Sequence, residues 1–429
     1  MSFLWNLGTK KISIGEVHVK ILQVTHLFYP DQLAGASLYT DLALFFKERG
    51  HDVRVTTTFP YYPALKFAAN DRGVLLREDI VRGIPVRRVG MWLPQPHRGW
   101  RRLAPEVALL GSLTLAGAPL NWTPDVVFVA CPMLSQAAWQ NLRTFAPGVP
   151  RLLVVQDSMA HSATELGIIK NRGLGWALHT FERWSFRAFE LHSTISLGMR
   201  KRVREIGGGR VPCVVTPNWI HGSLASLVDR RCEARENPER TVRGGLFYSG
   251  NFGVKQGLPS FLSMMDRAKD DWSMTVHGGG AETQALLDAA VSRKGWLKIG
   301  GLLDEIDYVD KLLGAGACVV TQMPGVGANF LPSKLLPALA TGTPVLGVCE
   351  MSSPLGQELQ SGGFGAIVEP GDVAGLREVL MRWRLDPSEL ARLSQNATRH
   401  ARRYTRERLC GRYEKILSLM AVGAVGSVI

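Results

Sequence analysis

A lysine at position 334 is the residue whose type and position most directly suggest chemistry. It follows Pro332 and Ser333 and opens an apolar helical pattern, which ends at Gly342 just before the strand-like run PVLGV. Ser333 is a plausible N-cap, and a lysine in the first turn of a helix opposes the helix dipole unless an anion binds at the same end. We therefore predict that Ser333 and Lys334 bind a phosphate group. The alternative is a solvated lysine on a helix, which is always common.

Two glycine-containing loops follow strand-like runs in the same half of the chain. The first is YSGNFGVKQGL at 248–258, and the second is VHGGGAE at 276–282. Such loops offer backbone amides to phosphate groups, and parallel sheets bind ligands at the carboxyl ends of their strands. Neither loop is a Walker A motif. The predicted phosphate-binding residues of the two loops are Gly250, Asn251, Lys255, Gln256, Gly278 and Gly279.

Three positions in the first half are weaker candidates. Gly35 lies between a strand-like run at 18–26 and a helical stretch, where a missing Cβ lets backbone amides approach a ligand, although an ordinary turn glycine is the more common explanation. The absence of G-x-G-x-x-G disfavours a nicotinamide dinucleotide site. Asp157 follows another strand-like run and could contact a substrate or cap the next helix. His161 lies close behind it and is more often a surface residue than a catalyst.

The segment 96–122 departs from the pattern of a soluble domain. It places a basic, tryptophan-containing head before a mainly apolar stretch that carries Glu106. This combination is marginal for a membrane span and better suited to an interfacial helix or to a buried core helix. The predicted membrane-contacting residues are Arg98, Arg101 and Arg102.

Strands alternating with helices must position these residues. In the first half, strand-like runs cover 18–26, 52–58, 84–92, 125–130 and 151–156. In the second half they cover 245–250, 273–279, 297–301, 318–322, 344–348 and 366–370. Helical patterns separate many of them and continue beyond residue 374. The pattern predicts an α/β fold with two doubly wound parallel sheets.

Composition narrows the class of protein. The chain has 429 residues, which favours two domains, and a formal net charge of +13, which favours an anionic partner such as a nucleic acid, an acidic membrane leaflet or a phosphorylated substrate. Its six cysteines are scattered without metal-ligand spacing, as expected for thiols in a reducing compartment. The first twenty residues contain too short an apolar core for a signal peptide, so we expect a cytoplasmic protein.

Several segments resemble the retaining glycosyltransferases of family four, most closely those of the colanic-acid and O-antigen type. The matching pieces include KILQVTHLFYPDQLAGASLYTDLALFFKERGHDVRVTTTFPYYP, LLVVQDSMAHSATELGI, VVTPNWI, YSGNFGVKQGL and FLPSKLLPALATGTPVLGV. The resemblance implies the GT-B fold, in which two Rossmann-like domains face a cleft and C-terminal helices pack back towards the N-terminal domain. The implied units are 1–17 (an extension), 18–205 (acceptor side), 206–395 (donor side) and 396–429 (helical).

The resemblance also implies roles for particular residues. Gly35 and the first glycine loop would lie near the donor phosphates, and Ser333 and Lys334 would face the diphosphate. Where many members carry two glutamates eight positions apart, this chain has Asn329 and Pro337, so Glu350 or Glu358 could replace the usual contact to the donor ribose. Where many members carry a histidine, this chain has Gln156 and Asp157. We therefore assign Lys334, Asp157 and His161 as candidate catalytic residues.

The predicted activity is the retaining transfer of a sugar from a nucleotide diphosphate donor, with UDP as the expected nucleotide. The sugar is expected to be an N-acetylated hexosamine or a deoxy-hexosamine. We expect no cofactor and no metal, because no D-x-D stands in a usable place. The expected acceptor is linked to a polyprenyl diphosphate at the cytoplasmic face of the inner membrane, where a peripheral enzyme would assemble O-antigen or exopolysaccharide. A sugar-nucleotide 2-epimerase of the same fold is one alternative, and a non-catalytic membrane-binding or nucleic-acid-binding protein is another.

Overall fold

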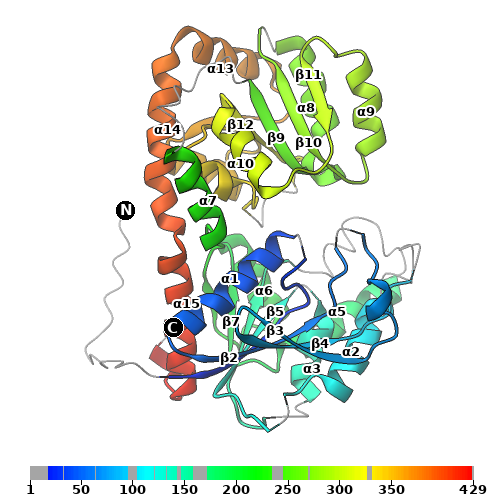
Figure 1. Ribbon diagram of the computed structural model, residues 1–429. Helices are drawn as coiled ribbons and strands as arrows, with labels where there is room; N and C mark the ends of the chain where they lie inside the picture. Colours follow the sequence, from blue (N-terminus) through cyan, green and yellow to red (C-terminus); the bar gives the residue numbers. More distant parts are fainter. Residues whose placement is uncertain are drawn as a thin grey trace.

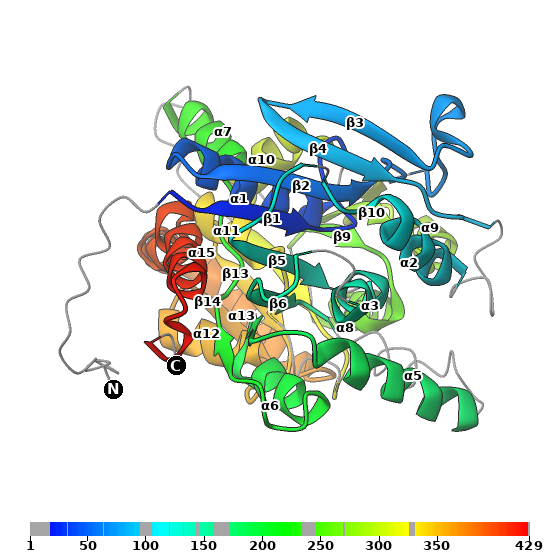
Figure 2. The ribbon, with the colours of Figure 1, turned by 90° about the horizontal axis from the view of Figure 1, so that it is seen from below.

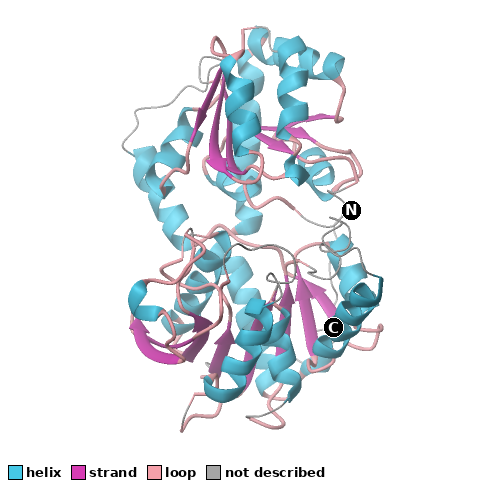
Figure 3. Ribbon diagram, turned by 90° about the vertical axis from the view of Figure 1, so that its right-hand side faces the viewer, coloured by secondary structure: helices cyan, strands magenta, loops and turns pink. Residues whose placement is uncertain are grey.

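The protein is described by a computed structural model over residues 18–31, 33–62, 64–94, 104–119, 121–131, 133–142, 146–157, 172–233, 245–268, 271–325 and 331–427. Its strands form two separate sheets, each flanked by helices, and Figures 1 and 3 show the two bodies one above the other. This arrangement confirms the predicted α/β class with two Rossmann-like units.

The first sheet has eight strands in the order β3-β4-β2-β1-β5-β6-β7-β8. Its strands are β1 (Lys20–Val24), β2 (Asp52–Thr58), β3 (Leu76–Val81), β4 (Ile84–Val89), β5 (Val126–Cys131), β6 (Arg151–Val155), β7 (Leu191–Thr194) and β8 (Cys213–Val215). All neighbouring strands are parallel except β3 and β4, which form an antiparallel hairpin at one edge. Every residue of β5 is buried, as expected for a central strand covered by helices on both faces.

The second sheet has six parallel strands in the order β11-β10-β9-β12-β13-β14. They are β9 (Leu246–Asn251), β10 (Met274–Gly279), β11 (Leu297–Gly300), β12 (Ala317–Thr321), β13 (Val345–Val348) and β14 (Gly365–Val368). The strand order reverses between β9 and β12, and such a switch point is where open α/β sheets bind ligands.

Helices cover the faces of both sheets. In the first unit they are α1 (Ala34–Glu48), α2 (Ala104–Ala116), α3 (Leu134–Leu142), α5 (Arg172–Phe186) and α6 (Leu197–Ile206), whereas α7 (Gly222–Glu233) follows the first sheet and packs on the second unit. In the second half they are α8 (Leu258–Ala268), α9 (Thr283–Val291), α10 (Glu305–Gly314), α11 (Leu335–Ala340), α12 (Pro354–Gly362), α13 (Val373–Leu385), α14 (Pro387–Ala401) and α15 (Arg406–Ala421). No helix in the described ranges has the length and apolar character needed to cross a bilayer.

The last two helices join the two units. Helix α14 packs against α11 and α13 of the second unit, whereas α15 packs against α1 and β5 of the first (Figure 1). A short 3₁₀ turn at Arg402–Tyr404 separates them. The C-terminal helices therefore do pack back towards the N-terminal domain, as the resemblance implied.

The chain crosses between the units a second time just before α7. Ile220 donates its amide to the carbonyl of Tyr404 at 2.8 Å, so the two crossings lie side by side. Trp219 donates its indole N–H to Asp41 of α1 at 2.8 Å, and Arg406 donates its Nε–H to the same carboxylate at 2.9 Å. A buried carboxylate thus ties both crossings to the first unit.

Several elements differ from the sequence prediction. Strands β3 and β7 were not predicted, because β3 has three consecutive charged residues at 77–79 and β7 carries the polar residues His192, Ser193 and Thr194, all of which are buried. Strand β8 pairs with β7, so the first sheet extends past the predicted boundary at residue 205. The run at 213–215 is therefore the last strand of the first sheet and not the first strand of the second.

Candidate functional site

The ammonium group of Lys334 lies buried next to the end of β9. Its Nζ lies 3.7 Å from the centre of the Tyr248 ring and has no hydrogen-bond partner among the described residues. Burial lowers the pKa of Lys334 from its ordinary 10.5 to about 8. An unpaired buried amine is costly, so this arrangement favours an anionic partner at the same place.

Lys334 is positioned by the turn that begins α11. The structure places Lys334 itself at the N-cap of this helix, with helical backbone angles. Ser333 is exposed in the preceding turn, where its carbonyl accepts the amide hydrogen of Leu336. The prediction that Ser333 caps the helix through its side chain is therefore wrong, because Lys334 occupies the N-cap and no side chain caps that helix end.

Glycines make room for the lysine at the carboxyl ends of β9 and β10. Gly250 has a φ of 141°, and a Cβ on it would lie 3.0 Å from the Nζ of Lys334. Gly278 pairs with Gly250 across the two strands, has a φ of 149°, and would place a Cβ 1.9 Å from the Gly250 carbonyl oxygen. A side chain at either position would disrupt this edge. The structure therefore brings together Lys334, Gly250 and Gly278 as the sequence predicted.

The remaining loop residues surround these strand ends. Asn251 is exposed, and its carbonyl accepts the hydroxyl hydrogen of Tyr248 at 2.8 Å. The Oε1 atom of Gln256 is buried and has no partner in the described chain. Lys255 is half-buried, and its carbonyl accepts the amide hydrogen of Met323 at 3.0 Å. Gly279 lies opposite Asn251 in the strand register. The loop thus presents several polar groups within one short stretch.

The two candidate glutamates differ in what they contact. The carboxylate of Glu358 accepts hydrogen bonds from His400, at 2.5 Å, and from Tyr404. Glu358 therefore ties α12 to α14 and the turn after it. Glu350 lies two residues beyond β13, and its carboxylate accepts the amide hydrogen of Gly325 at 3.1 Å. Glu350 is consequently the better placed of the two to contact a ligand at this edge of the sheet.

Two residues near Lys334 were missed by the sequence reasoning. Tyr248 supplies the aromatic face under the ammonium group, and Glu282 follows β10 with its Oε2 atom buried and without a partner in the described chain. The amide of Glu282 donates to the carbonyl of Phe252 at 2.9 Å, which holds the second glycine loop against the first. A polar residue directly after a predicted strand was the available signal for Glu282. Nothing in the sequence pattern set Tyr248 apart from the apolar residues of its strand.

The first-unit candidates lie at the carboxyl ends of β1 and β6. Gly35 is the second residue of α1, and a Cβ on it would lie 3.3 Å from the Cδ1 atom of Leu27. Asp157 is exposed just beyond β6. Gln156 exchanges two hydrogen bonds with the side-chain amide of Asn218, at 2.9 and 3.1 Å. His161 lies outside the described residues.

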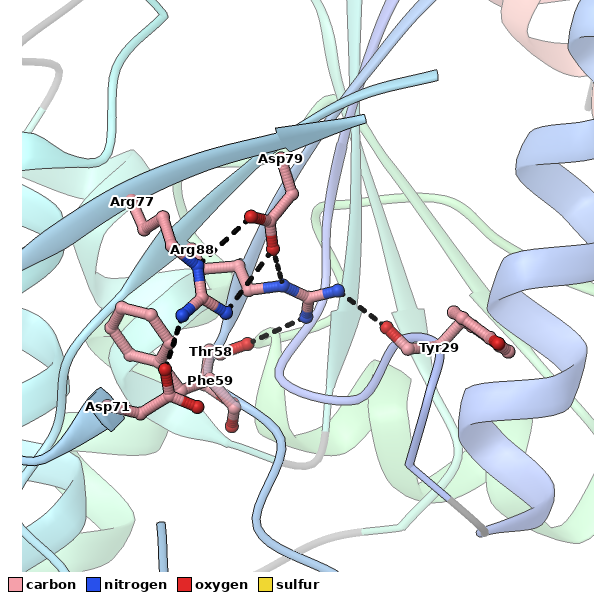
Figure 4. Close-up of polar contacts among 7 residues, drawn as sticks. All are labelled: Tyr29, Thr58, Phe59, Asp71, Arg77, Asp79 and Arg88. Carbon is pink, nitrogen blue, oxygen red and sulfur yellow. Dashed lines mark hydrogen bonds and ion pairs between the residues drawn. The ribbon is translucent and has the colours of Figure 1, made fainter. Parts of the chain in front are cut away.

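An arginine that the sequence reasoning did not single out organises the loops after β1 and β2. Arg88 of β4 is 2% exposed and donates to the carbonyls of Tyr29, at 2.6 Å, and Thr58, at 3.3 Å (Figure 4). Its Nε–H donates to Asp79 of β3 at 2.5 Å, and Arg77 donates to the same carboxylate at 3.0 Å. Because the Tyr29 loop leads into α1, Arg88 fixes the backbone near Gly35.

The predicted membrane segment is described only from residue 104 onward. Arg98, Arg101 and Arg102 lie outside the described residues. Helix α2 buries Leu109 and Leu113 against the first sheet, and the carboxylate of Glu106 accepts the amide hydrogens of Leu134, at 3.3 Å, and Ser135, at 2.9 Å. Glu106 therefore caps the start of α3 and holds α2 on the first unit.

The described residues contain no group of three or more histidine, cysteine, aspartate or glutamate side chains that could hold a metal ion.

Comparisons with known proteins agree with this geometry. Residues 35–219 match the glycosyl transferase 4-like domain. The match covers less than half of the chain and identifies this part of it as a glycosyl transferase 4-like domain. Over 387 residues, which are 85% of this chain and 92% of the relative, the chain is 28% identical to WcaI of Escherichia coli K12, named a putative colanic acid biosynthesis glycosyl transferase.

Solved structures confirm the fold. The chain is similar to sucrose-phosphate synthase of Thermosynechococcus elongatus, with a TM-score of 0.67, 13% identity, and coverage of 94% of this chain and 99% of that one. It is also similar to HepE of Anabaena in complex with UDP, with a TM-score of 0.62, 14% identity, and coverage of 93% and 99%. The chain therefore has the GT-B fold.

Proposed function

We propose that this glycosyltransferase transfers an N-acetylated hexosamine or a deoxy-hexosamine from a UDP-linked donor, with retention of configuration, to a polyprenyl diphosphate-linked acceptor. The product would enter a cell-surface polysaccharide such as O-antigen or exopolysaccharide. The likeness to a relative named for colanic acid biosynthesis supports the polysaccharide, and the UDP in the HepE complex supports the nucleotide.

The buried ammonium of Lys334, which has no hydrogen-bond partner in the described part of the chain, carries the proposal. It stands beside the bare backbone of Gly250 and Gly278, at the carboxyl edge of β9 and β10. A diphosphate bound there would pair with this charge and with loop amides as negative charge builds on the leaving group. The acceptor hydroxyl would attack from the face that the nucleotide leaves, so no side chain has to form a covalent intermediate. Asp157 and His161 are proposed to contact the transferred sugar or the acceptor.

The proposed acceptor places the enzyme at a membrane. We propose that it is a peripheral protein on the cytoplasmic face of the inner membrane, where the basic segment containing Arg98, Arg101 and Arg102 contacts anionic lipid. The net charge of +13 supports this location.

A screen of nucleotide sugars by thermal shift tests the donor, because a ligand that binds only the folded state raises the melting temperature. We expect a UDP-sugar to give the largest increase and Lys334→Ala to abolish it. The stabilising donor is then incubated with and without a lipid-linked acceptor. If the donor is converted to an epimer without any acceptor, the protein is the 2-epimerase instead. If no nucleotide sugar raises the melting temperature, the proposal is overturned.

A further inference from the structure

Helix α5 carries an apolar stripe on its outward face. Leu174, Ala177 and Trp184 follow the spacing of one helix face, with Leu174 46% and Trp184 37% exposed. Phe181 lies between them in the sequence and is partly buried against the core of the first unit. The rings of Phe181 and Trp184 are stacked, with centroids 5.8 Å apart. Trp176, beside this stripe, is 72% exposed. In a soluble monomer a helix normally turns its apolar side inward, so this face is built to meet an apolar medium.

The opposite face of α5 is what fixes the helix to the protein. Gly175, Glu182, Ser185 and Phe186 are all buried. The Asn141 side chain of α3 donates a hydrogen bond to the Trp184 carbonyl at 2.9 Å. The exposed tryptophans therefore lie on a helix whose other face is packed against the first unit.

Positive charge borders the apolar stripe. Arg183 and Arg187 are exposed on α5 and just beyond it, whereas Glu182, the one carboxylate among residues 173–187, is 1% exposed. Helix α6 lies in contact with α5 and has a hollow of about 390 Å³ lined in part by Arg200, Lys201 and Arg204. Figure 2 shows α5 and α6 along the border of the molecule opposite β3.

We infer that this α5–α6 face, made of the apolar stripe, Trp176 and the bordering basic residues, docks on an anionic lipid bilayer. Tryptophan is favoured at the boundary between lipid headgroups and acyl chains, and each arginine or lysine near an anionic surface adds attraction. A second copy of the chain fits the face less well, because two basic faces would repel each other. The inference rests on the proposed membrane-bound acceptor and extends it to a described surface distinct from 96–122.

The position of α5 suits such an acceptor. The chain leaves the carboxyl end of β6 at Asp157 and later enters α5, whose first turns carry Leu174 and Trp176. Leu174 and Trp176 therefore lie at the amino-terminal end of α5, which follows the carboxyl edge of the first sheet along the chain. Docking there would hold a lipid-linked sugar near the edge that carries Gly35 and Asp157.

Vesicle sedimentation of the full chain tests the inference. Phosphatidylcholine vesicles, with and without phosphatidylglycerol, are mixed with the parent, with Trp176→Ser/Trp184→Ser, and with Arg183→Glu/Arg187→Glu. We expect the parent to bind the phosphatidylglycerol vesicles and to be released by high salt. The tryptophan pair should weaken binding by on the order of tenfold, and the arginine pair by on the order of a hundredfold.

Matched changes in the second unit serve as controls. Val291→Ser/Leu385→Ser removes two side chains that are 66% and 72% exposed, and Lys294→Glu/Lys298→Glu reverses two exposed charges. Both controls should bind vesicles like the parent, and all variants should keep the parental melting temperature.

Three outcomes would overturn the inference. The parent could fail to bind the phosphatidylglycerol vesicles, or the α5 variants could bind them at the parental level. Alternatively, the tryptophan variant could convert a dimer to a monomer in sedimentation velocity while vesicle binding is unchanged, which would make this face an interface between copies. Donor turnover, measured without vesicles, reports on the proposed function separately, because it does not require α5.

Discussion

The buried position of Lys334 is unfavourable in the free protein and becomes favourable when an anion binds beside it. Its ammonium is buried without a hydrogen-bond partner among the residues that the structure describes, yet it stands where a diphosphate is proposed to bind. We predict that Lys334→Ala keeps or slightly raises the melting temperature of the free protein while lowering turnover by on the order of a hundredfold or more. Lys334→Arg should recover only part of the activity, because a planar guanidinium does not place its charge where the ammonium lay.

Transfer rate, donor affinity and melting temperature of both variants, measured beside the parent, check this prediction. Parental turnover by Lys334→Ala would place the phosphate site elsewhere.

The lowered pKa of Lys334 predicts a particular dependence on pH. Because its pKa is about 8 in the folded protein and 10.5 ordinarily, the unfolded chain binds more protons between these values, so this lysine makes stability rise with pH across that window. Binding of a diphosphate needs the ammonium, so donor affinity should fall by up to about tenfold per pH unit above 8. Melting temperatures with and without UDP from pH 7 to 10 measure both effects. Lys334→Ala, the control, should lack both trends.

Activity is predicted not to need a divalent cation. The proposed site offers Lys334 and loop amides to the leaving diphosphate, and no carboxylate pair is assigned to hold a metal ion against it. Transfer should therefore continue in EDTA at close to the parental rate. Complete loss on chelation, with recovery in magnesium or manganese, would contradict this assignment.

Among the elements, the β3–β4 hairpin has an effect beyond its own edge of the sheet. Arg88 reaches from β4 to the carbonyls of Tyr29 and Thr58, and Asp79 of β3 holds its guanidinium. We predict that Arg88→Met lowers the free energy of unfolding by about 3 kcal/mol, because the buried Asp79 contact and two carbonyls lose their donor. The acceptor KM should rise several-fold while donor affinity stays unchanged, since the affected loops belong to the first unit.

Arg77→Met is the matched control for that change. Arg77 shares Asp79 and also pairs with Asp71, but among the described residues it does not contact the Tyr29 or Thr58 carbonyl, so its removal should leave the acceptor KM unchanged. Urea unfolding and acceptor titrations compare the two variants. Equal losses from both would show that Arg88 has no special part in holding the loops.

Apolar runs predicted most strands, since the central strands of a parallel sheet are buried on both faces. Strand β2 matches its predicted bounds, and β9 to β14 match within one or two residues. The exceptions have a physical cause. Strand β7 is polar because its buried side chains find partners in the fold, as Thr194 does at the carbonyl of Val155, and no local pattern reveals those partners. The antiparallel β3 depends on arginines of β4 and on Asp71, which only the folded chain brings near.

The sequence could predict the position of the candidate site only in part. Strand ends identified the glycine loops, because ligands bind at carboxyl edges, and the first turn of a helical pattern identified Lys334. The cation–π contact with Tyr248 and the Arg88 contacts could not be predicted, since each depends on the orientation of a side chain from another strand.

At the scale of the whole molecule, Asp41 links both chain crossings to the first unit. Its carboxylate is largely buried and accepts hydrogen bonds from Trp219, Gly222 and Arg406. We predict that Asp41→Asn lowers the free energy of unfolding by about 3 kcal/mol, because Arg406 keeps its charge in a poorly solvated place.

Glu48→Gln removes the other carboxylate that contacts Arg406, but Glu48 is 59% exposed, so this control should cost less than about 1 kcal/mol. Calorimetry of both variants checks the difference, and equal losses would contradict the assignment.

The return of α15 to the first unit has a consequence for biosynthesis. Ribosomes deliver the first sheet early, but Tyr413 packs against Phe128 of β5 and against Trp219, and Leu409, Ile416 and Leu417 belong to the same core. These residues are translated after the whole second unit. The amino-terminal half therefore leaves the ribosomal tunnel with an open apolar surface and completes its core only once α15 has emerged, so a nascent chain stalled before Arg406 should present a binding surface to chaperones.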